Sequence, residues 1–136
     1  MGVSQHTICV RVRYVECDPM GFLHHSAYLP YMEMGRTELL RAQGFQYRDL
    51  EADGVFFVVT KLSISFKKPA RYDDELELQT KITRQTAVRI EHAYEIYHKE
   101  SRLLLCTAES TLACIGRDGQ VREIPDNLRT TESERT

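Results

Sequence analysis

The chain has 136 residues, of which 42% are hydrophobic and 28% are charged, and it contains no Trp. This length corresponds to one domain, and a domain of ~150 residues buries about 70% of its unfolded surface on folding. The 18 Lys and Arg residues nearly balance the 20 Asp and Glu residues, so the net charge of −2 argues against nucleic acid or an anionic membrane as the main partner. The longest apolar stretch, residues 55–59, is far below the ~18 residues of a membrane span, so we expect no integral membrane contact. No charged-then-apolar signal opens the chain, and we expect a soluble, cytoplasmic protein.

The four cysteines, Cys9, Cys17, Cys106 and Cys114, form no Cys-x-x-Cys pair and no tight cluster. Disulfides are not expected in a chain of this size without an export signal, and structural zinc sites usually take their ligands from closely spaced pairs. We therefore expect free, mostly buried thiols and no metal.

The first part of the chain predicts one strand and a turn. From Ile8 to Tyr14, apolar and polar residues alternate, which is typical of a half-buried strand. The irregular segment that follows, residues 16–21, contains Pro19 and Gly21, which favour turns.

A helix of about four turns is predicted after His25, because the spacing of the apolar residues there becomes helical. Ser26 is a candidate N-cap, and Gly44 is a candidate C-terminal stop. Pro30 is tolerated only near the first turn of a helix, so the helix should begin close to it.

From Val55 onward the period is two, which predicts four long strands with turns near residues 69–74 and 83–86. A strand, a helix and four further strands predict an α+β fold with an antiparallel sheet. One helix is buried against five strands only if the sheet curls around it. Gly35 on the helix and the small residues Ala108 and Ser110 on the last strand would permit this close approach.

The outer face of this sheet is expected to carry more apolar side chains than solvent favours. These side chains are Phe57, Val59, Leu103, Leu105 and Ile115. A patch of this size is usually covered by another subunit. We assign residues 1–124 to a single domain and residues 125–136 to a polar, disordered tail.

The polar segment between the first strand and the helix, residues 14–28, is the candidate functional region. A helix N-terminus offers free backbone N–H groups and a partial positive charge, and it can hold a developing oxyanion. Asp18 lies seven residues before His25, where its carboxylate could face that end as a base or nucleophile for acyl hydrolysis. On spacing alone, an Asx-turn before Pro19 is the more common role for such an aspartate.

Other chemistries have less support in this region. The neighbours His24 and His25 should point apart, with one of them structural, and either alone is more often a packed or solvated residue than a catalyst. A metal site of Cys17, Asp18 and His25 lacks a second ligand cluster. The sequence contains no Ser-centred nucleophile elbow, no Gly-x-Gly-x-x-Gly motif and no Walker loop.

Two blocks of sequence carry a family resemblance that covers the chain from about residue 8 to residue 115. The first block is Tyr14-x3-Asp18-x2-Gly21-x3-His25-x2-Tyr28-x4-Glu33-x2-Arg36. The second runs from Phe57-Val58-Val59 through Ile64-Ser65-Phe66-Lys67-Lys68-Pro69-Ala70-Arg71-Tyr72-Asp73-Asp74. Together they resemble the hot-dog-fold acyl-CoA thioesterases of the 4-hydroxybenzoyl-CoA thioesterase type and of the Tol-Pal-associated type.

The resemblance implies a hot-dog fold, in which a five-stranded antiparallel sheet wraps one long helix. It also implies a homodimer formed edge to edge, or a homotetramer of two such dimers, with active sites at the dimer interface. The implied reaction is hydrolysis of an acyl-CoA thioester to a carboxylic acid and CoA. No cofactor is implied, because CoA is part of the substrate.

The resemblance also assigns three catalytic residues. Asp18 matches the loop aspartate that acts as nucleophile or general base. His25 matches the position whose backbone N–H polarises the thioester carbonyl, and whose side chain belongs to the site in the Tol-Pal-associated branch. Tyr14 matches the tyrosine that accompanies those two residues.

Substrate binding is expected from aromatic and basic side chains. Phe22, Leu23, the helix face with Tyr28, and a partner subunit would line the acyl pocket. CoA phosphates need cations, and Lys67, Lys68 and Arg71 cluster at a strand end. Arg84 and Arg89 are further candidates, and a solvated basic rim is the alternative for each of these residues.

Two other functions stay open. An enoyl-CoA hydratase of the same fold is disfavoured, because the pattern Asp-x-Asn-Pro-x-His is missing and Asp18-Pro19 leads into Met20-Gly21. The second is a non-catalytic module that binds acyl groups or CoA. The acyl group, the choice between nucleophile and general base, and the choice between dimer and tetramer are not determined by the sequence.

Overall fold

The computed structural model describes residues 3–128. Five strands run in chain order as β1 (Gln5–Arg11), β2 (Phe56–Phe66), β3 (Glu75–Gln85), β4 (Arg89–His98) and β5 (Leu104–Ile115). Two helices, α1 (Tyr28–Ala42) and α2 (Tyr47–Ala52), lie between β1 and β2. Short 3-10 turns cover Tyr14–Glu16, His25–Ala27 and Asp126–Leu128.

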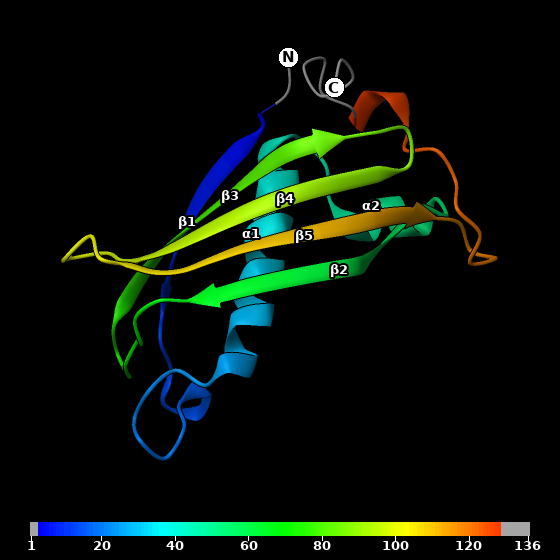
Figure 1. Ribbon diagram of the computed structural model, residues 1–136. Helices are drawn as coiled ribbons and strands as arrows, with labels where there is room; N and C mark the ends of the chain where they lie inside the picture. Colours follow the sequence, from blue (N-terminus) through cyan, green and yellow to red (C-terminus); the bar gives the residue numbers. More distant parts are fainter. Residues whose placement is uncertain (1–2, 129–136) are drawn as a thin grey trace.

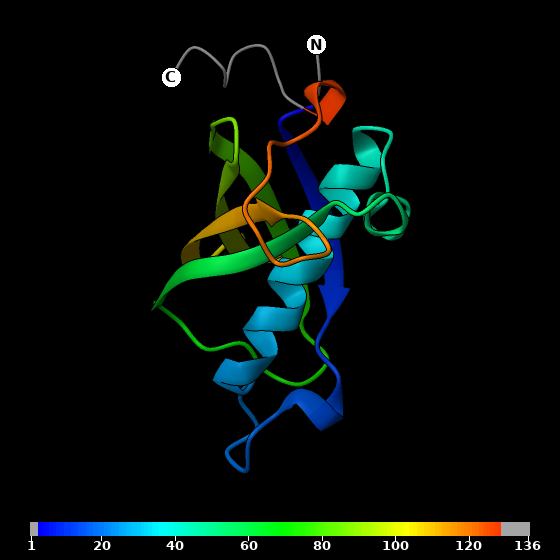
Figure 2. The same cartoon turned by 90° about the vertical axis from the view of Figure 1, so that its right-hand side faces the viewer.

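The five strands form one antiparallel sheet in the order β1-β3-β4-β5-β2. The sheet curves around α1, which lies along one of its faces (Figures 1 and 2). The predicted α+β hot-dog fold is therefore confirmed. No helix in the described part of the chain is long and apolar enough to cross a membrane.

The main core lies between α1 and the inner face of the sheet. It joins Tyr28, Tyr31 and Met32 of α1 to alternate residues of the central strands, including Leu76, Leu78, Tyr94, Ile96 and Ala108. The closest approach is at Gly35, where a Cβ atom would meet Thr80 Oγ1 and would lie 3.0 Å from Leu78 Cδ2. The predicted role of Gly35 in close helix–sheet packing is confirmed.

The first strand lies three residues earlier than predicted, because it runs from Gln5 to Arg11 and Tyr14, outside it, is 80% exposed. Val12 still pairs with the turn before β3, since its N–H donates to Asp74 O at 2.9 Å. The carboxylate of Glu16 then accepts the backbone N–H of Arg13 at 2.8 Å, and this bond turns the chain into the 3-10 turn.

The predicted apolar outer face is wrong at three of its residues, Phe57, Val59 and Leu105. The pairing of β4 with β5 shifts by one residue between Ile96 and Tyr97, so Leu105 lies in a bulge and is buried in the core. A second bulge, after Val59, reverses the faces of β2. Phe57 consequently packs against the second core cluster, which closes the far end of the fold.

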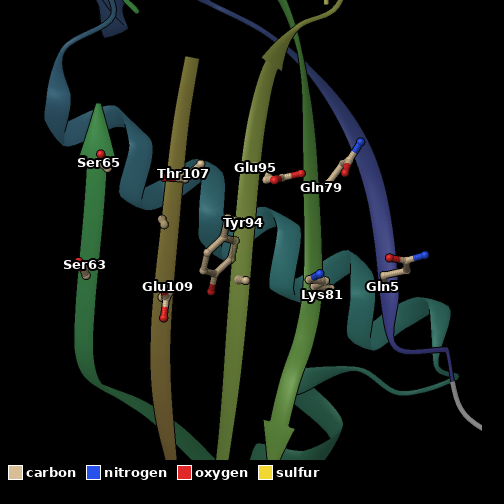
Figure 3. Close-up of a pocket in the computed structure, with 11 residues that line it drawn as sticks. Gln5, Ser63, Ser65, Gln79, Lys81, Tyr94, Glu95, Thr107 and Glu109 are labelled. Carbon is tan, nitrogen blue, oxygen red and sulfur yellow. The ribbon is translucent and has the colours of Figure 1, made fainter. Parts of the chain in front are cut away.

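The outer face is largely polar instead. A shallow depression of about 350 Å³ crosses it and is lined mainly by short polar and charged side chains (Figure 3). Val59 pairs with the buried Leu112 and so shares the inner side of β2 with Phe57, although it is 48% exposed at this sheet edge. Leu103, which was also expected on the outer face, is 47% exposed. The outer apolar patch is thus smaller than the sequence pattern suggested.

The second cluster contains Leu40, Val55, Cys114, Ile124 and Leu128, and residues of α2 pack against it. Helix α2 was not predicted. The expected tail begins with the 3-10 turn Asp126–Leu128, whose Leu128 is buried, and residues 129–136 lie outside the described residues.

All four cysteines are free thiols, but only Cys106 and Cys114 are buried. Cys17 is half-buried and Cys9 is exposed, because Cys9 lies on the outer face of the edge strand β1.

Candidate active site

The connection from β1 to α1 forms a closed loop that extends beyond the sheet (Figure 1). Cys17 and Leu23 pair as an isolated antiparallel bridge, and Asp18 N donates to Phe22 O at 2.8 Å. His24 N donates to Glu16 O at 2.8 Å, and this pair lies nearer the base of the loop than the pair of Asp18 and Phe22. Asp18 therefore lies on a backbone-paired hairpin, so its position is well defined.

Asp18 uses one carboxylate oxygen to close its own turn. Oδ1 accepts the backbone N–H groups of Met20 at 2.9 Å and Phe22 at 3.1 Å. Gly21 permits this turn with its φ of +84°. The Asx-turn expected from spacing is thus present, but it occupies a single oxygen, and Oδ2 accepts no hydrogen bond from residues 3–128.

His24 caps the 3-10 turn His25–Ala27 that leads into α1. The N-cap position of α1 itself is Ala27, which makes no side-chain cap hydrogen bond, so the prediction that Ser26 is the N-cap is wrong. His24 Nδ1 accepts the backbone N–H of Ser26 at 3.1 Å and lies 2.8 Å from Ser26 Oγ. Ser26 cannot cap, because it lies inside the 3-10 turn His25–Ala27 that precedes α1. The rings of His24 and His25 stack at 4.2 Å, so the expectation that they point apart is also wrong.

One backbone donor remains unused at this helix start. Three neighbouring N–H groups are engaged: His24 donates to Glu16 O, Ser26 to His24 Nδ1, and Ala27 to His24 O. No group in the described part of the chain accepts the N–H of His25. This loop therefore presents a free carboxylate oxygen and a free N–H group within eight residues.

A groove of about 250 Å³ lies beside His25. It is lined by Leu23, His25, Tyr28, Phe66, Lys67, Lys68 and Pro69. Tyr28 and Phe66 pack edge to face, with ring centroids 5.0 Å apart. Burial raises the pKa of Tyr28 to about 12, although a backbone hydrogen bond from Ala70 opposes the shift, so the phenol is neutral. Five of the residues predicted for the site thus share one groove: Leu23, His25, Tyr28, Lys67 and Lys68.

Phe22 and Arg71 form a pair next to this groove. Their backbones make an isolated antiparallel bridge, and the Arg71 guanidinium lies 4.6 Å from the centre of the Phe22 ring. Phe22 also exchanges both of its backbone hydrogen-bonding groups with Asp18. Phe22 therefore contacts Arg71 on one side and Asp18 on the other, and it links these two residues.

Asp18 does not itself line the groove. Three further predicted residues lie apart from it. Tyr14 packs edge to face on Tyr72, with centroids 5.7 Å apart, and makes no hydrogen bond with Asp18 or His25. Arg84 and Arg89 flank the β3–β4 turn, at the opposite end of the sheet from the Asp18 loop. A direct role for these two arginines at the groove is thus excluded within one chain.

Sequence reasoning missed the contact between Glu16 and Tyr31. The Tyr31 hydroxyl donates to Glu16 Oε1 at 2.6 Å. Burial alone would raise the pKa of Glu16, but hydrogen bonds from Tyr31 and Arg13 outweigh it and hold the pKa below its usual value. A buried tyrosine on the inner helix face needs a polar partner, and that need was the available signal.

Known proteins similar to this chain identify its family. The family model described as "Thioesterase-like superfamily" matches residues 12–131. The chain is 38% identical over 106 residues to the acyl-CoA thioester hydrolase YbgC of Escherichia coli, covering 78% of each protein. It is 34% identical over 107 residues to the acyl-CoA thioesterase YbgC of Haemophilus influenzae, covering 78% of this chain and 77% of that protein.

A solved structure gives the same result. The DHNA-CoA thioesterase from Staphylococcus aureus superposes with a TM-score of 0.84 at 28% identity, over 88% of this chain and 80% of that one. The chain therefore belongs to the thioesterase-like superfamily and has its hot-dog fold.

Proposed function

We propose that this protein hydrolyses acyl-CoA thioesters to a free carboxylic acid and CoA, with Asp18 as the base or nucleophile. The relatives named above as acyl-CoA thioester hydrolases support the reaction class. The observation that carries the catalytic assignment is the pair of unused groups on one loop, Asp18 Oδ2 and the N–H of His25.

The chemistry follows from these two groups. On the general-base route, Asp18 takes a proton from water as the water oxygen attacks the thioester carbonyl. The His25 N–H donates to the oxyanion of the tetrahedral intermediate. Collapse of the intermediate expels the CoA thiolate, which recovers the proton from Asp18.

The nucleophilic route uses the same groups. Asp18 Oδ2 attacks the carbonyl, the CoA thiolate leaves, and water cleaves the resulting mixed anhydride. A single turnover in oxygen-18 water identifies this route when water attacks the Asp18 carboxyl carbon of the anhydride, because only that attack places label in the Asp18 carboxylate.

The groove is suited to both parts of the substrate. Leu23, Tyr28 and Phe66 offer an apolar surface for the acyl group, and Lys67 and Lys68 offer charge for the CoA phosphates. Arg71, over the ring of Phe22, is a further candidate for a phosphate contact. We propose that no cofactor is required, since hydrolysis of a thioester needs only water and these groups.

We also propose that a second copy of the chain completes the site, as a homodimer or a homotetramer. Strand β2 lies at the edge of the sheet, and its Val58 and Val59 are 40% and 48% exposed. An exposed apolar edge strand favours pairing with another strand.

A thiol-release assay against aromatic, short aliphatic and dihydroxynaphthoyl CoA thioesters tests the function. Release of CoA thiol by the wild type, and its loss in Asp18→Asn, is the expected result. Loss of the enoyl absorbance without thiol release would instead identify a hydratase. Saturable binding without turnover of any substrate would identify a binding module.

A further inference from the structure

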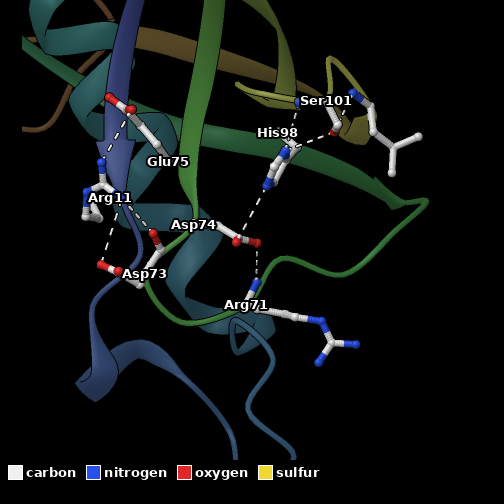
Figure 4. Close-up of polar contacts among 8 residues, drawn as sticks. Arg11, Arg71, Asp73, Asp74, Glu75, His98 and Ser101 are labelled. Carbon is white, nitrogen blue, oxygen red and sulfur yellow. Dashed lines mark hydrogen bonds and ion pairs between the residues drawn. The ribbon is translucent and has the colours of Figure 1, made fainter.

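A chain of polar contacts connects the turn between β4 and β5 to the turn before β3 (Figure 4). Asp74 is at its centre. Asp74 Oδ2 accepts the backbone N–H of Arg71 at 2.9 Å, and Asp74 N donates to Arg71 O at 3.1 Å. Asp74 Oδ1 lies 3.6 Å from His98 Nε2, and both side chains are about one quarter exposed.

Ser101 orients the His98 ring through Nδ1, the ring nitrogen that does not face Asp74. Ser101 N donates to His98 Nδ1 at 3.2 Å, and Ser101 Oγ lies 2.9 Å from the same nitrogen. Because Nδ1 accepts a backbone N–H, the hydrogen of the neutral ring is on Nε2, where it faces Asp74. Ser, His and Asp have the composition of a hydrolytic triad, but here the Ser101 backbone occupies the ring nitrogen that would have to act as base. The cluster is therefore a support for Asp74.

The turn that Asp74 closes contacts the Asp18 loop directly. The backbones of Arg71 and Phe22 form an isolated antiparallel bridge, and Leu23 N donates to Ala70 O at 2.8 Å. On its other side, the N–H of Phe22 donates to Asp18 Oδ1. Only one residue, Phe22, thus separates the Arg71 turn from the carboxylate of Asp18.

We infer that Asp74 is a positioning residue for the proposed hydrolysis, which fixes the Arg71 turn against Phe22 and so orients the Asp18 carboxylate. This inference rests on the proposed function. A carboxylate that accepts a backbone N–H makes a strong, charge-assisted bond, so it can hold this turn in one geometry. A displacement of about 1 Å in a catalytic group is enough to lower turnover by ~10²-fold.

Substitutions of Asp74 and Asp73 in the same turn distinguish the positioning role of Asp74 from a general effect of losing one negative charge there. Asp74→Ala removes the side-chain contacts with the Arg71 N–H and with His98 but keeps the backbone bond from Asp74 N to Arg71 O, whereas Asp74→Asn retains a side-chain oxygen for the Arg71 N–H. Asp73→Asn is the matched control, because Asp73 is exposed, lies 3.8 Å from Arg11 and does not contact Arg71. The control tolerates the φ of +70° at this position, since Asn readily adopts positive φ.

We expect Asp74→Ala to lower kcat by up to about 10²-fold with a much smaller change in KM. Asp74→Asn should recover most of the turnover, and Asp73→Asn should match the wild type. In an Asp18→Asn background, Asp74→Ala should cause no further loss, because its effect acts through Asp18. An unchanged kcat, or a loss that adds to that of Asp18→Asn, would overturn the inference.

Amide hydrogen exchange tests the positioning role of Asp74 without a measurement of activity. The amides of Phe22 and Leu23 should exchange about tenfold faster in Asp74→Ala than in Asp73→Asn, which corresponds to about 1.4 kcal/mol of local opening. Unchanged exchange at these two amides would refute the positioning role. If Asp74→Ala does not fold, Asp74→Asn is compared with Asp73→Asn in the same way, with a smaller increase expected. If Asp18→Asn turns over normally, the catalytic assignment of Asp18 fails, and exchange still decides whether Asp74 fixes the loop.

Discussion

The hydroxyl of Tyr31 donates a 2.6 Å hydrogen bond to Glu16 Oε1 and thereby joins the buried face of α1 to the loop that carries Asp18. Glu16 also accepts the backbone N–H of Arg13 through its carboxylate and that of His24 through its carbonyl. One residue therefore holds the entry and the exit of the loop, and Tyr31 fixes that residue to the core.

Removing the hydroxyl should destabilise the fold. We expect Tyr31→Phe to lower the free energy of unfolding by about 1.5–3 kcal/mol, because the charged Glu16 loses a hydrogen bond in a half-buried site. Urea unfolding measures this change. Tyr97→Phe is the control, since Tyr97 donates at 3.0 Å to Glu95 on an exposed surface and should change stability by less than about 0.5 kcal/mol.

The same carboxylate should contribute to acid sensitivity. The pKa of Glu16 is held below its usual value in the folded protein, so the unfolded chain takes up a proton there at a higher pH. The stability from this group is present above the unfolded pKa and is lost as the pH falls through the folded pKa. Between pH 5 and 3, approximately the range around a normal Glu pKa, unfolding free energies should fall less steeply for Glu16→Gln than for the wild type. Parallel curves would contradict the assignment.

Much of the fold was predictable because alternation reports which side of a strand is buried. Leu76, Leu78, Tyr94 and Ile96 all face α1 as their spacing predicted. The error at Leu105 has a simple cause: a bulge shifts the pairing by one residue, and an alternating pattern carries no sign of it. Helix α2 was missed because its six residues are too few to display a helical period.

The candidate site was predictable only in part. Asp18 was found because Pro19 and Gly21 indicate a turn and because the family pattern marks that position. The pairing of Arg71 with Phe22 joins residues 49 positions apart, and a single sequence carries no signal for such a contact. The same is true of His98 and Asp74, which meet only when β3 and β4 pair.

Asp18→Asn should separate chemistry from folding. The amide oxygen can still accept the N–H groups of Met20 and Phe22, so the loop should keep its shape. The basic oxygen is lost, and we expect kcat to fall by about 10²–10⁴-fold. Steady-state kinetics with unchanged circular dichroism and unfolding midpoint would support the assignment, whereas near-normal turnover would contradict it.

The basic residues near the groove should affect binding more than turnover. We expect Lys67→Ala and Arg71→Ala to raise KM for acyl-CoA by roughly tenfold, about 1.4 kcal/mol, with less effect on a short thioester that lacks the nucleotide. The effect should weaken at high salt, because it depends on charge. Arg84→Ala, at the opposite end of the sheet, is the control and should leave KM unchanged. Equal effects on both substrates would show that these side chains do not contact the nucleotide part.

The contact between α1 and the sheet at Gly35 allows a test of the packing. In Gly35→Ala, the new Cβ would meet Thr80 Oγ1 and would lie 3.0 Å from Leu78 Cδ2. We expect a loss of about 1–3 kcal/mol from overpacking, although Ala is favoured over Gly in a helix by about 1 kcal/mol. Thr80 Oγ1 is buried without a hydrogen-bond partner among residues 3–128, so Thr80→Ala alone should cost little and should open space for the new methyl group. The double variant should therefore be more stable than Gly35→Ala in urea unfolding, and strictly additive free energies would show that the helix moves away from the sheet instead.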